Sequence, residues 1–169
     1  MKEKKIEGYV ISGRGQAASL VTRNSNLLFS MLGKELFPGS LNVVLNEPVI
    51  FRIREGNVFD SGRRYIWQAR IEGVQDPVYV YRWHGCPLHI LEVMSICKLR
   101  TELNLRDFDE IKIILDEEVV INSVSTLRKS FWAIFWRYRE HWYYSNEIYK
   151  RMVYRIKLRI FCSQRMNDM

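Results

Sequence analysis

The sequence predicts a mainly β protein, a small β-barrel with short helices, followed by a helical C-terminal extension rich in basic and aromatic residues. Over about the first 120 residues, short segments with β-branched and aromatic side chains recur at close intervals, separated by turn residues. From Thr126 to Phe161 the chain contains neither Pro nor Gly and is rich in helix formers. This change in pattern predicts two domains, residues 1–121 and residues 122–169.

Each element of the predicted barrel follows from its local pattern. Alternation and flanking turn residues predict strands over residues 5–12, 41–45, 63–72, 78–83 and 110–115, the last of these being the final strand. Residues 25–35 predict a short helix that begins at Ser25 or Asn26, and residues 98–104 predict a helical turn. Residues 90–96 are apolar and fit either a strand or a helix.

Composition argues against several classes of protein. Of the 169 residues, 47% are apolar and 27% are charged, which is typical of a globular protein. The charged N-terminus has no apolar segment of a signal peptide behind it, and no apolar run approaches the roughly 18–20 residues of a membrane span. Cys86, Cys97 and Cys162 form no C-x-x-C pair, which argues against a disulfide framework or a zinc site. We therefore expect a cytoplasmic protein.

The net charge of +7 belongs to the C-terminal extension. From Asn122 onward there are ten Lys and Arg residues and three acids, Glu140, Glu147 and Asp168, and ten minus three gives +7. Residues 1–121 hold the other 16 basic and 16 acidic residues, so the first domain is neutral. A neutral barrel argues against nucleic acid as its ligand, because that binding depends on neutralising phosphates with cations.

Two short motifs have the composition of a site for phosphate and metal. Gly13-Arg14-Gly15 follows the first predicted strand, and backbone N–H groups at such a turn approach an anion closely. Ser40 and Asn42 are two residues apart as a strand begins, so both side chains point to one face, and their neutral oxygens suit Mg²⁺. A simple tight turn and a polar strand start are the alternatives.

A third motif lies in residues 92–101. Glu92 suits a substrate hydroxyl and the cations Lys98 and Arg100 suit phosphate, with ordinary surface charge as the alternative. In their order and spacing, the three motifs resemble those of the archaeal-type CTP-dependent riboflavin kinases over about residues 6–116. The segments that carry this resemblance are Gly8-x-Val10-x-Ser12-Gly13-x-Gly15, Pro38-Gly39-Ser40-Leu41-Asn42, Lys98-Leu99-Arg100 and Leu105-Arg106-Asp107-x-Asp109-x-Ile111-Lys112-Ile113.

The resemblance implies a cradle-loop (RIFT-like) β-barrel and a reaction. The reaction is Mg²⁺-dependent transfer of the γ-phosphoryl group of CTP to the ribityl 5′-hydroxyl of riboflavin, giving FMN and CDP. By position, the implied nucleotide-binding residues are Arg14, Gly15, Gln16, Ala17, Ala18, Ser19, Cys97, Lys98, Leu99 and Arg100. Ser40 and Asn42 would ligate Mg²⁺, and His84 and Glu92 would contact the flavin. Glu92 is the expected catalytic residue, which orients or deprotonates the acceptor hydroxyl.

Departures from the family pattern leave alternatives open. Ala17-Ala18 stands where the family has a further Gly, and Ser40 where it has Thr. Residues 81–89 do not resemble the family's Thr- or Ser-containing stretch on the flavin side, so another hydroxyl-bearing metabolite is an alternative acceptor. A non-catalytic nucleotide- or flavin-binding sensor on the same barrel is the alternative from another class. For His84 and His89 we favour a substrate contact or a loop histidine over a metal site.

The C-terminal extension interleaves aromatic residues with its cations. On one continuous helix, Phe131, Phe135, Tyr138 and Trp142 share a face. We favour packing of this helix on the barrel or in a homodimer. A membrane surface, another protein partner and nucleic acid are the alternatives. The family resemblance does not extend to this segment.

Overall fold

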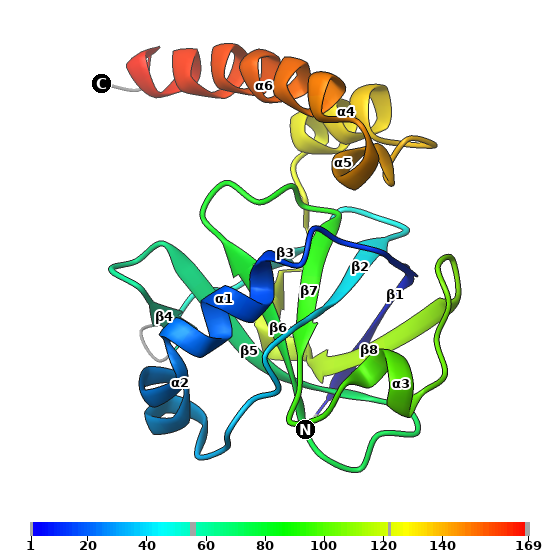
Figure 1. Cartoon of the computed structure of the whole chain (residues 1–169). Helices are drawn as coiled ribbons and strands as arrows, with labels where there is room; N and C mark the ends of the chain where they lie inside the picture. The colour runs from blue at the N-terminus through cyan, green and yellow to red at the C-terminus, as the bar shows by residue number, and fades with distance from the viewer. Residues whose placement is uncertain (1, 55–56, 122, 168–169) are drawn as a thin grey trace. The chain divides into compact units, whose positions relative to one another are not determined.

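Residues 2–54, 57–121 and 123–167 are described by the structure, a computed structural model (Figure 1). The chain divides into two compact units, Met1–Ser125 and Thr126–Met169. In the described residues, the strands all belong to the first unit, whereas the second unit consists of helices.

Six antiparallel strands form a closed barrel in the described part of the first unit. In ring order they are β1 (Glu3–Ile11), β2 (Leu41–Leu45), β7 (Ile90–Met94), β6 (Val78–Trp83), β5 (Arg64–Ile71) and β8 (Glu110–Asp116). The ring closes where Arg70 and Ile71 of β5 pair with Ile114 and Ile113 of β8, while β8 also pairs along β1. The expected mainly β barrel is therefore confirmed.

Shorter elements complete this unit. β4 (Val58–Phe59) pairs with β5, and β3 (Ile50–Phe51) pairs with β9 (Val120–Ile121). The helices are α1 (Gln16–Arg23), α2 (Ser25–Leu32) and α3 (Leu99–Glu102), and a 3-10 turn covers Glu117–Val119. β8 confirms the strand predicted at residues 110–115, but β9 follows it, so the prediction that this strand is the final one was wrong. A strand of two residues is too short to produce a periodic signal.

The helical predictions were partly correct. α2 begins at Ser25 as expected, but it ends at Leu32 because Gly33 adopts φ 67° and stops the helix. α1 was not predicted, although Gln16–Arg23 is composed largely of residues that tolerate a helix. The ambiguous residues 90–96 form a strand, β7, with partners on both sides.

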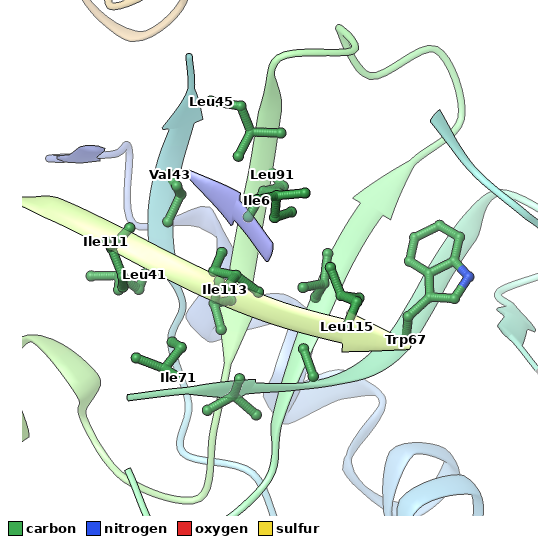
Figure 2. Packing of buried hydrophobic residues seen from close by; sticks show 14 of the residues in the cluster. Ile6, Leu41, Val43, Leu45, Trp67, Ile71, Leu91, Ile111, Ile113 and Leu115 are labelled. Atoms are coloured by element: carbon green, nitrogen blue, oxygen red, sulfur yellow. The ribbon is translucent and has the colours of Figure 1, made fainter. Parts of the chain in front are cut away.

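The barrel interior is filled by alternate residues of its strands. Figure 2 shows Ile6, Val43, Leu91 and Ile113 among the side chains that meet there from four different strands. Val43, Leu91 and Ile113 are completely buried. Burying a side chain of this size contributes about 1.5–3 kcal/mol, so this core is a main source of stability.

A second apolar cluster lies on the outer face of the barrel. Leu20 and Val21 of α1 and Leu28 of α2 pack there with residues of the sheet, which are Ile66, Tyr79, Tyr81 and Met94. The alternation along β5, β6 and β7 thus supplies one face to the barrel core and the other to the helices. This cluster holds α1 against the strands that carry the candidate site.

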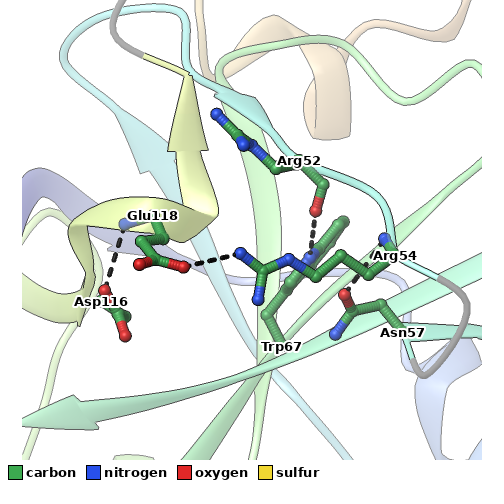
Figure 3. A network of polar contacts seen from close by, with 6 residues as sticks. All are labelled: Arg52, Arg54, Asn57, Trp67, Asp116 and Glu118. Atoms are coloured by element: carbon green, nitrogen blue, oxygen red, sulfur yellow. Dashed lines mark hydrogen bonds and ion pairs between the residues drawn. The ribbon is translucent and has the colours of Figure 1, made fainter.

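Polar contacts connect the segment after β3 with the turn that precedes β9 (Figure 3). The indole N–H of Trp67 donates to the carbonyl of Arg52 at 2.9 Å. The Arg54 guanidinium bonds Oε2 of Glu118 at 2.8 Å, and the N–H of Glu118 donates to Oδ1 of Asp116 at 3.1 Å. These contacts support the small β3–β9 pairing beside the barrel.

Gly8→Ala is expected to destabilise the barrel strongly. A Cβ at Gly8 would lie 2.3 Å from the carbonyl oxygen of Val44, which is backbone of the paired strand β2 and cannot rotate away. We expect a loss of about 3 kcal/mol in the free energy of unfolding, the upper range for overpacking, measured by urea denaturation. Gly33→Ala is the control, since its Cβ meets no atom of the described residues within 4 Å and its φ of 67° is what opposes the change. Equal losses for the two variants would contradict this account.

The second unit contains three helices in its described residues, α4 (Thr126–Phe135), α5 (Trp142–Ser145) and α6 (Glu147–Asn167). Trp136, Tyr143 and Val153 are buried. The ring of Trp136 makes edge-to-face contacts with those of Tyr143 and Tyr149. A small aromatic core therefore holds this unit together. No helix in the described parts of the chain is long and apolar enough to span a bilayer.

The predicted aromatic face of one continuous helix was wrong. α4 ends at Phe135, and Tyr138 has φ 66° and is 80% exposed. The N–H groups of Trp136 and Arg137 both bond the carbonyl of Trp132, which closes the helix. The chain turns there, so Phe135 and Tyr138 do not share a helical face.

Candidate functional site

A row of paired residues crosses the outer face of the barrel. Asn42 of β2 lies opposite Ile11 of β1 and Glu92 of β7, and Glu92 lies opposite Tyr81 of β6. Paired residues point to the same face of a sheet, and the residues on either side of Asn42 along β2 belong to the barrel core. Asn42, Glu92 and Tyr81 therefore lie side by side on the outer face.

Ser40, immediately before β2, joins this row through its hydroxyl. Its Oγ donates a hydrogen bond of 2.6 Å to Oε2 of Glu92. Burial raises the pKa of Glu92, whereas the hydrogen bond from Ser40 and the positive charge of Arg64 act in the opposite direction. The carboxylate is thus partly desolvated, and neighbouring charges act strongly on it.

The first glycine turn packs against the side chain of Asn42. A Cβ atom added at Gly13 would lie 2.1 Å from Nδ2 and 2.8 Å from Oδ1 of Asn42, so the amide occupies the space that a larger residue would need. The glycine turn and the Ser40–Asn42 segment, predicted separately from the sequence, are therefore adjacent in the fold.

α1 begins directly after this turn. Gly15 has φ 68° and leads into the helix, whose first turn contains Gln16, Ala17, Ala18 and Ser19. The first N–H groups of a helix have no intrahelical acceptor, and here no side chain of the described residues caps them and no acid occupies the first turn. Such a helix start attracts an anion. Arg14, Gln16 and Ser19 are exposed, and Ala17 and Ala18 are half-buried.

The third motif contacts the glycine turn through Asp107. Ser12 Oγ and Arg100 Nη1 both donate to Oδ1 of Asp107, at 3.0 and 2.8 Å. Burial acts against ionisation, but the hydrogen bonds from Arg100 and Ser12 prevail and lower the pKa of Asp107. Asp107 therefore links the end of β1 to α3.

The other residues of this motif differ in exposure. Lys98 is exposed at the start of α3, whereas Leu99 is 4% exposed and packs in the barrel core. Leu99 can therefore offer a ligand only its backbone. Cys97 Sγ lies 3.6 Å from Ser95 Oγ, and the carbonyl of Ser95 accepts the N–H of Phe37 at 2.8 Å. That last bond joins the third motif to the segment before β2.

The two histidines of the flavin-side segment differ in exposure. His84 is exposed in the turn after β6, with Nδ1 3.4 Å from the hydroxyl of Tyr65, whereas His89 is completely buried. Within the described ranges, no group of three or more His, Cys, Asp or Glu side chains is placed to hold a metal ion. The structure thus brings together Gly13, Ser40, Asn42 and Glu92, but among the described residues His84 contacts Tyr65 and not Glu92.

Two neighbours of Glu92 were missed by the sequence reasoning. Arg64 Nη1 donates to the hydroxyl of Tyr81, and Arg64 Nε donates to Oδ2 of Asp60 at 2.6 Å. Burial raises the pKa of Tyr81 to about 12, so its hydroxyl is neutral and accepts the bond from Arg64. In the sequence, Arg64 stands out only as a member of a predicted strand, and Tyr81 only as a member of a predicted strand and of the flavin-side segment. Only the register of β5, β6 and β7 brings them to Glu92.

Gly13→Ala is expected to damage the site while leaving the fold intact. The clashing atoms belong to the flexible end of Asn42, so the amide moves aside at little cost and leaves its place beside the turn. We expect Mn²⁺ affinity, measured by electron paramagnetic resonance in the presence of CTP, to fall about 10–100-fold.

Gly33→Ala is the matched control outside the site. Among the described residues, nothing lies within 4 Å of its Cβ, and its φ of 67° costs about 1–2 kcal/mol of stability. Metal affinity should then change little in this variant. Unchanged Mn²⁺ affinity in Gly13→Ala would show that Asn42 does not act at this position.

The fold and this cluster define a class: a small closed β-barrel protein with an anion-attracting helix start beside hydroxyl, amide and carboxylate oxygens. No family model matches the chain. The chain is 34% identical over 122 residues to a riboflavin kinase of Pyrococcus abyssi, covering 64% of this chain and 57% of that protein. It is 31% identical over 118 residues to a riboflavin kinase of Methanothermobacter thermautotrophicus, covering 62% of this chain and 93% of that protein.

The chain belongs to the archaeal-type riboflavin kinase family. The chain is also 31% identical over 128 residues to a riboflavin kinase of Archaeoglobus fulgidus. This match covers 66% of this chain and 55% of that protein. The chain thus spans a little over half of the Pyrococcus and Archaeoglobus proteins but nearly all of the Methanothermobacter protein.

Proposed function

We propose that this protein is a kinase that transfers the γ-phosphoryl group of CTP to the ribityl 5′-hydroxyl of riboflavin, forming FMN and CDP. The contact between Gly13 and Asn42 carries this proposal, because it joins a turn suited to phosphate with a residue suited to metal at one place. Membership of the family supports riboflavin as the acceptor.

The phosphate chain of CTP would lie at the start of α1. Free N–H groups of its first turn would donate to phosphate oxygens, and the helix dipole favours their negative charge. Exposed Arg14 and Lys98 add positive charge. Asp107 connects Arg100 to Ser12, just before the glycine turn, so nucleotide contacts from both motifs would reach the same region.

Ser40 and Asn42 fit Mg²⁺ as ligands. The Ser40 hydroxyl donates its hydrogen bond to Glu92, so the lone pairs of its oxygen are available for a metal. Mg²⁺ favours a small number of protein oxygens together with phosphate oxygens and water, and a hydroxyl plus an amide carbonyl suits that preference. When bound, Mg²⁺ would neutralise negative charge on the phosphate oxygens.

Glu92 would act on the acceptor. Its carboxylate would accept the proton of the riboflavin 5′-hydroxyl as that oxygen forms its bond to the γ-phosphorus. The bond between the γ-phosphorus and the β,γ-bridging oxygen breaks at the same time, and CDP leaves with the electron pair. Ser40 holds one carboxylate oxygen and leaves the other for the acceptor. Positioning therefore supplies most of the catalysis, as is typical of phosphoryl transfer.

A kinase for another hydroxyl-bearing metabolite is the second candidate. Residues 82, 86 and 89 of the flavin-side segment are buried, which leaves His84 as its exposed polar side chain. This segment would suit an acceptor that hydrogen-bonds the imidazole of His84 instead of a Ser or Thr hydroxyl of the protein. The nucleotide and metal residues would be the same in both candidates.

Product analysis tests the proposal. The full chain is incubated with Mg²⁺ and either CTP or ATP, with and without riboflavin, and CDP, ADP and FMN are separated by chromatography. We expect CDP and FMN in equal amounts, and neither product without riboflavin or in the presence of excess chelator. CTP binding without FMN formation would overturn riboflavin as the acceptor, and absence of nucleotide binding would overturn the kinase.

A further inference from the structure

Arg64 and Tyr81 lie beside Glu92 but have no part in the proposed phosphoryl transfer. We propose that they are positioning residues, which hold the Glu92 carboxylate beside Ser40 and Asn42 and balance its charge without occupying its oxygens. This inference rests on the proposed kinase function, because it assigns a role to the surroundings of the same carboxylate.

The strand register confines Glu92 between two side chains. Tyr81 lies directly opposite it on β6, and Asn42 lies directly opposite it on β2. Side chains at such positions are in contact distance of one another across the sheet. Tyr81 is 2% exposed, and its ring packs against Phe59 with centroids 6.2 Å apart. The buried ring of Tyr81 therefore restricts the side chain of Glu92 on one side.

Arg64 is held at both ends of its guanidinium. Nη1 donates to the Tyr81 hydroxyl, and Nε donates to Oδ2 of Asp60 at 2.6 Å. Two fixed acceptors restrict an otherwise flexible side chain to one orientation. From this position its positive charge attracts the carboxylate of Glu92. Hydrogen bonds to Tyr81 and Asp60, and not a bond to Glu92, thus fix the position of the positive charge of Arg64.

This indirect arrangement has a chemical advantage over a direct ion pair. Arginine commonly binds a carboxylate through two parallel hydrogen bonds, which would take both oxygens of Glu92. Among the described residues, Ser40 is the one that hydrogen-bonds this carboxylate, through Oε2 alone. Tyr81 keeps Arg64 near enough to act by its charge, while Oε1 is left for an acceptor hydroxyl.

Substitutions that separate charge from shape test this role. Arg64→Met removes the charge at similar length, Arg64→Lys keeps it, and Tyr81→Phe removes only the hydroxyl. Arg63→Met is the control, because Arg63 is the exposed residue that directly precedes Arg64 and β5. We expect Arg64→Met to lower kcat about 10–100-fold, the range for residues that orient a functional group without touching the substrate. The Kd for CTP and the KM for riboflavin should change less than twofold, and Arg64→Lys should recover most of the kcat.

A crystal structure of Arg64→Met supplies a readout that does not depend on turnover. We expect Glu92 to leave its hydrogen bond with Ser40 in that variant and to keep it in Arg63→Met. Unchanged kcat in Arg64→Met, or equal losses in Arg64→Lys and Arg64→Met, would overturn the role of the charge. If the unmodified protein formed no FMN, the proposed function would fail by itself. The position of Glu92 in the variant would then decide this inference alone.

Discussion

Glu92→Gln is expected to lower the turnover of riboflavin about 10²–10⁴-fold, the usual contribution of a general base. The amide has the size of the carboxylate and its oxygen can still accept the bond from Ser40, so the neighbouring residues should keep their places. Only the capacity to take the acceptor proton is removed. The measurement is kcat from FMN formation at saturating CTP and riboflavin.

The control for this variant is Glu110→Gln, an exposed glutamate on β8 that belongs to no part of the candidate site. Its turnover should match that of the unmodified protein. The affinity of Glu92→Gln for CTP, measured by calorimetry, should also be unchanged, because the proposed phosphate-binding groups lie on α1 and near α3. Normal turnover in Glu92→Gln would remove Glu92 from the proton-transfer step and leave it a purely structural partner of Ser40.

Arg82→Leu is expected to cost about 3–5 kcal/mol of stability, the range for an interaction network broken in a protein interior. Arg82 is 5% exposed, and its guanidinium donates to the carbonyls of Ile90, Val49 and Leu88 at 2.9, 2.7 and 2.6 Å. It also lies over the ring of Phe51, 4.5 Å from the centroid. Leucine would leave three carbonyls without their donor, which is the main source of the loss.

Two further substitutions separate geometry from charge at this position. Burial lowers the pKa of Arg82 to about 10, yet the group remains charged at neutral pH. Arg82→Lys should therefore be destabilised as well, because an ammonium cannot reach three carbonyls in the plane of a guanidinium. Arg70→Leu, which removes a surface partner of Glu3, should cost at most about 1 kcal/mol. Urea unfolding curves measure all three, and similar midpoints for Arg82→Leu and Arg70→Leu would contradict this account.

The role of Arg82 explains why the flavin-side segment was difficult to interpret from its sequence. Residues 81–89 contain one Arg, two His and one Cys. Residue types of this kind suggest a ligand-binding or metal-binding site. In the structure, Arg82, Cys86 and His89 are buried, and Arg82 holds the backbone of the loop that follows. Residue type alone does not tell a buried structural arginine from a binding one, because burial is a property of the whole fold.

Strands of five or more residues were predicted better than the strands of two residues. β2 and β6 have the bounds that the sequence indicated, and β1, β5 and β8 differ by at most two residues at either end. The failures were short or atypical elements: β3, β4 and β9 contain two residues each, and α1 follows a glycine turn without a capping side chain. Elements of this kind depend on their neighbours for stability, so their own residues carry little signal.

The sequence by itself determined the alternating strands, the glycine turn and the spacing of Ser40 and Asn42, because these follow from the local geometry of the chain. It also determined the neutral charge of the first domain and the basic character of the second. Only the tertiary structure decided that Gly13 contacts Asn42, that Glu92 bonds Ser40, and that Arg64 and Tyr81 lie beside that carboxylate. Those contacts depend on the register between strands that are distant in sequence, and register is set by the packing of the entire barrel.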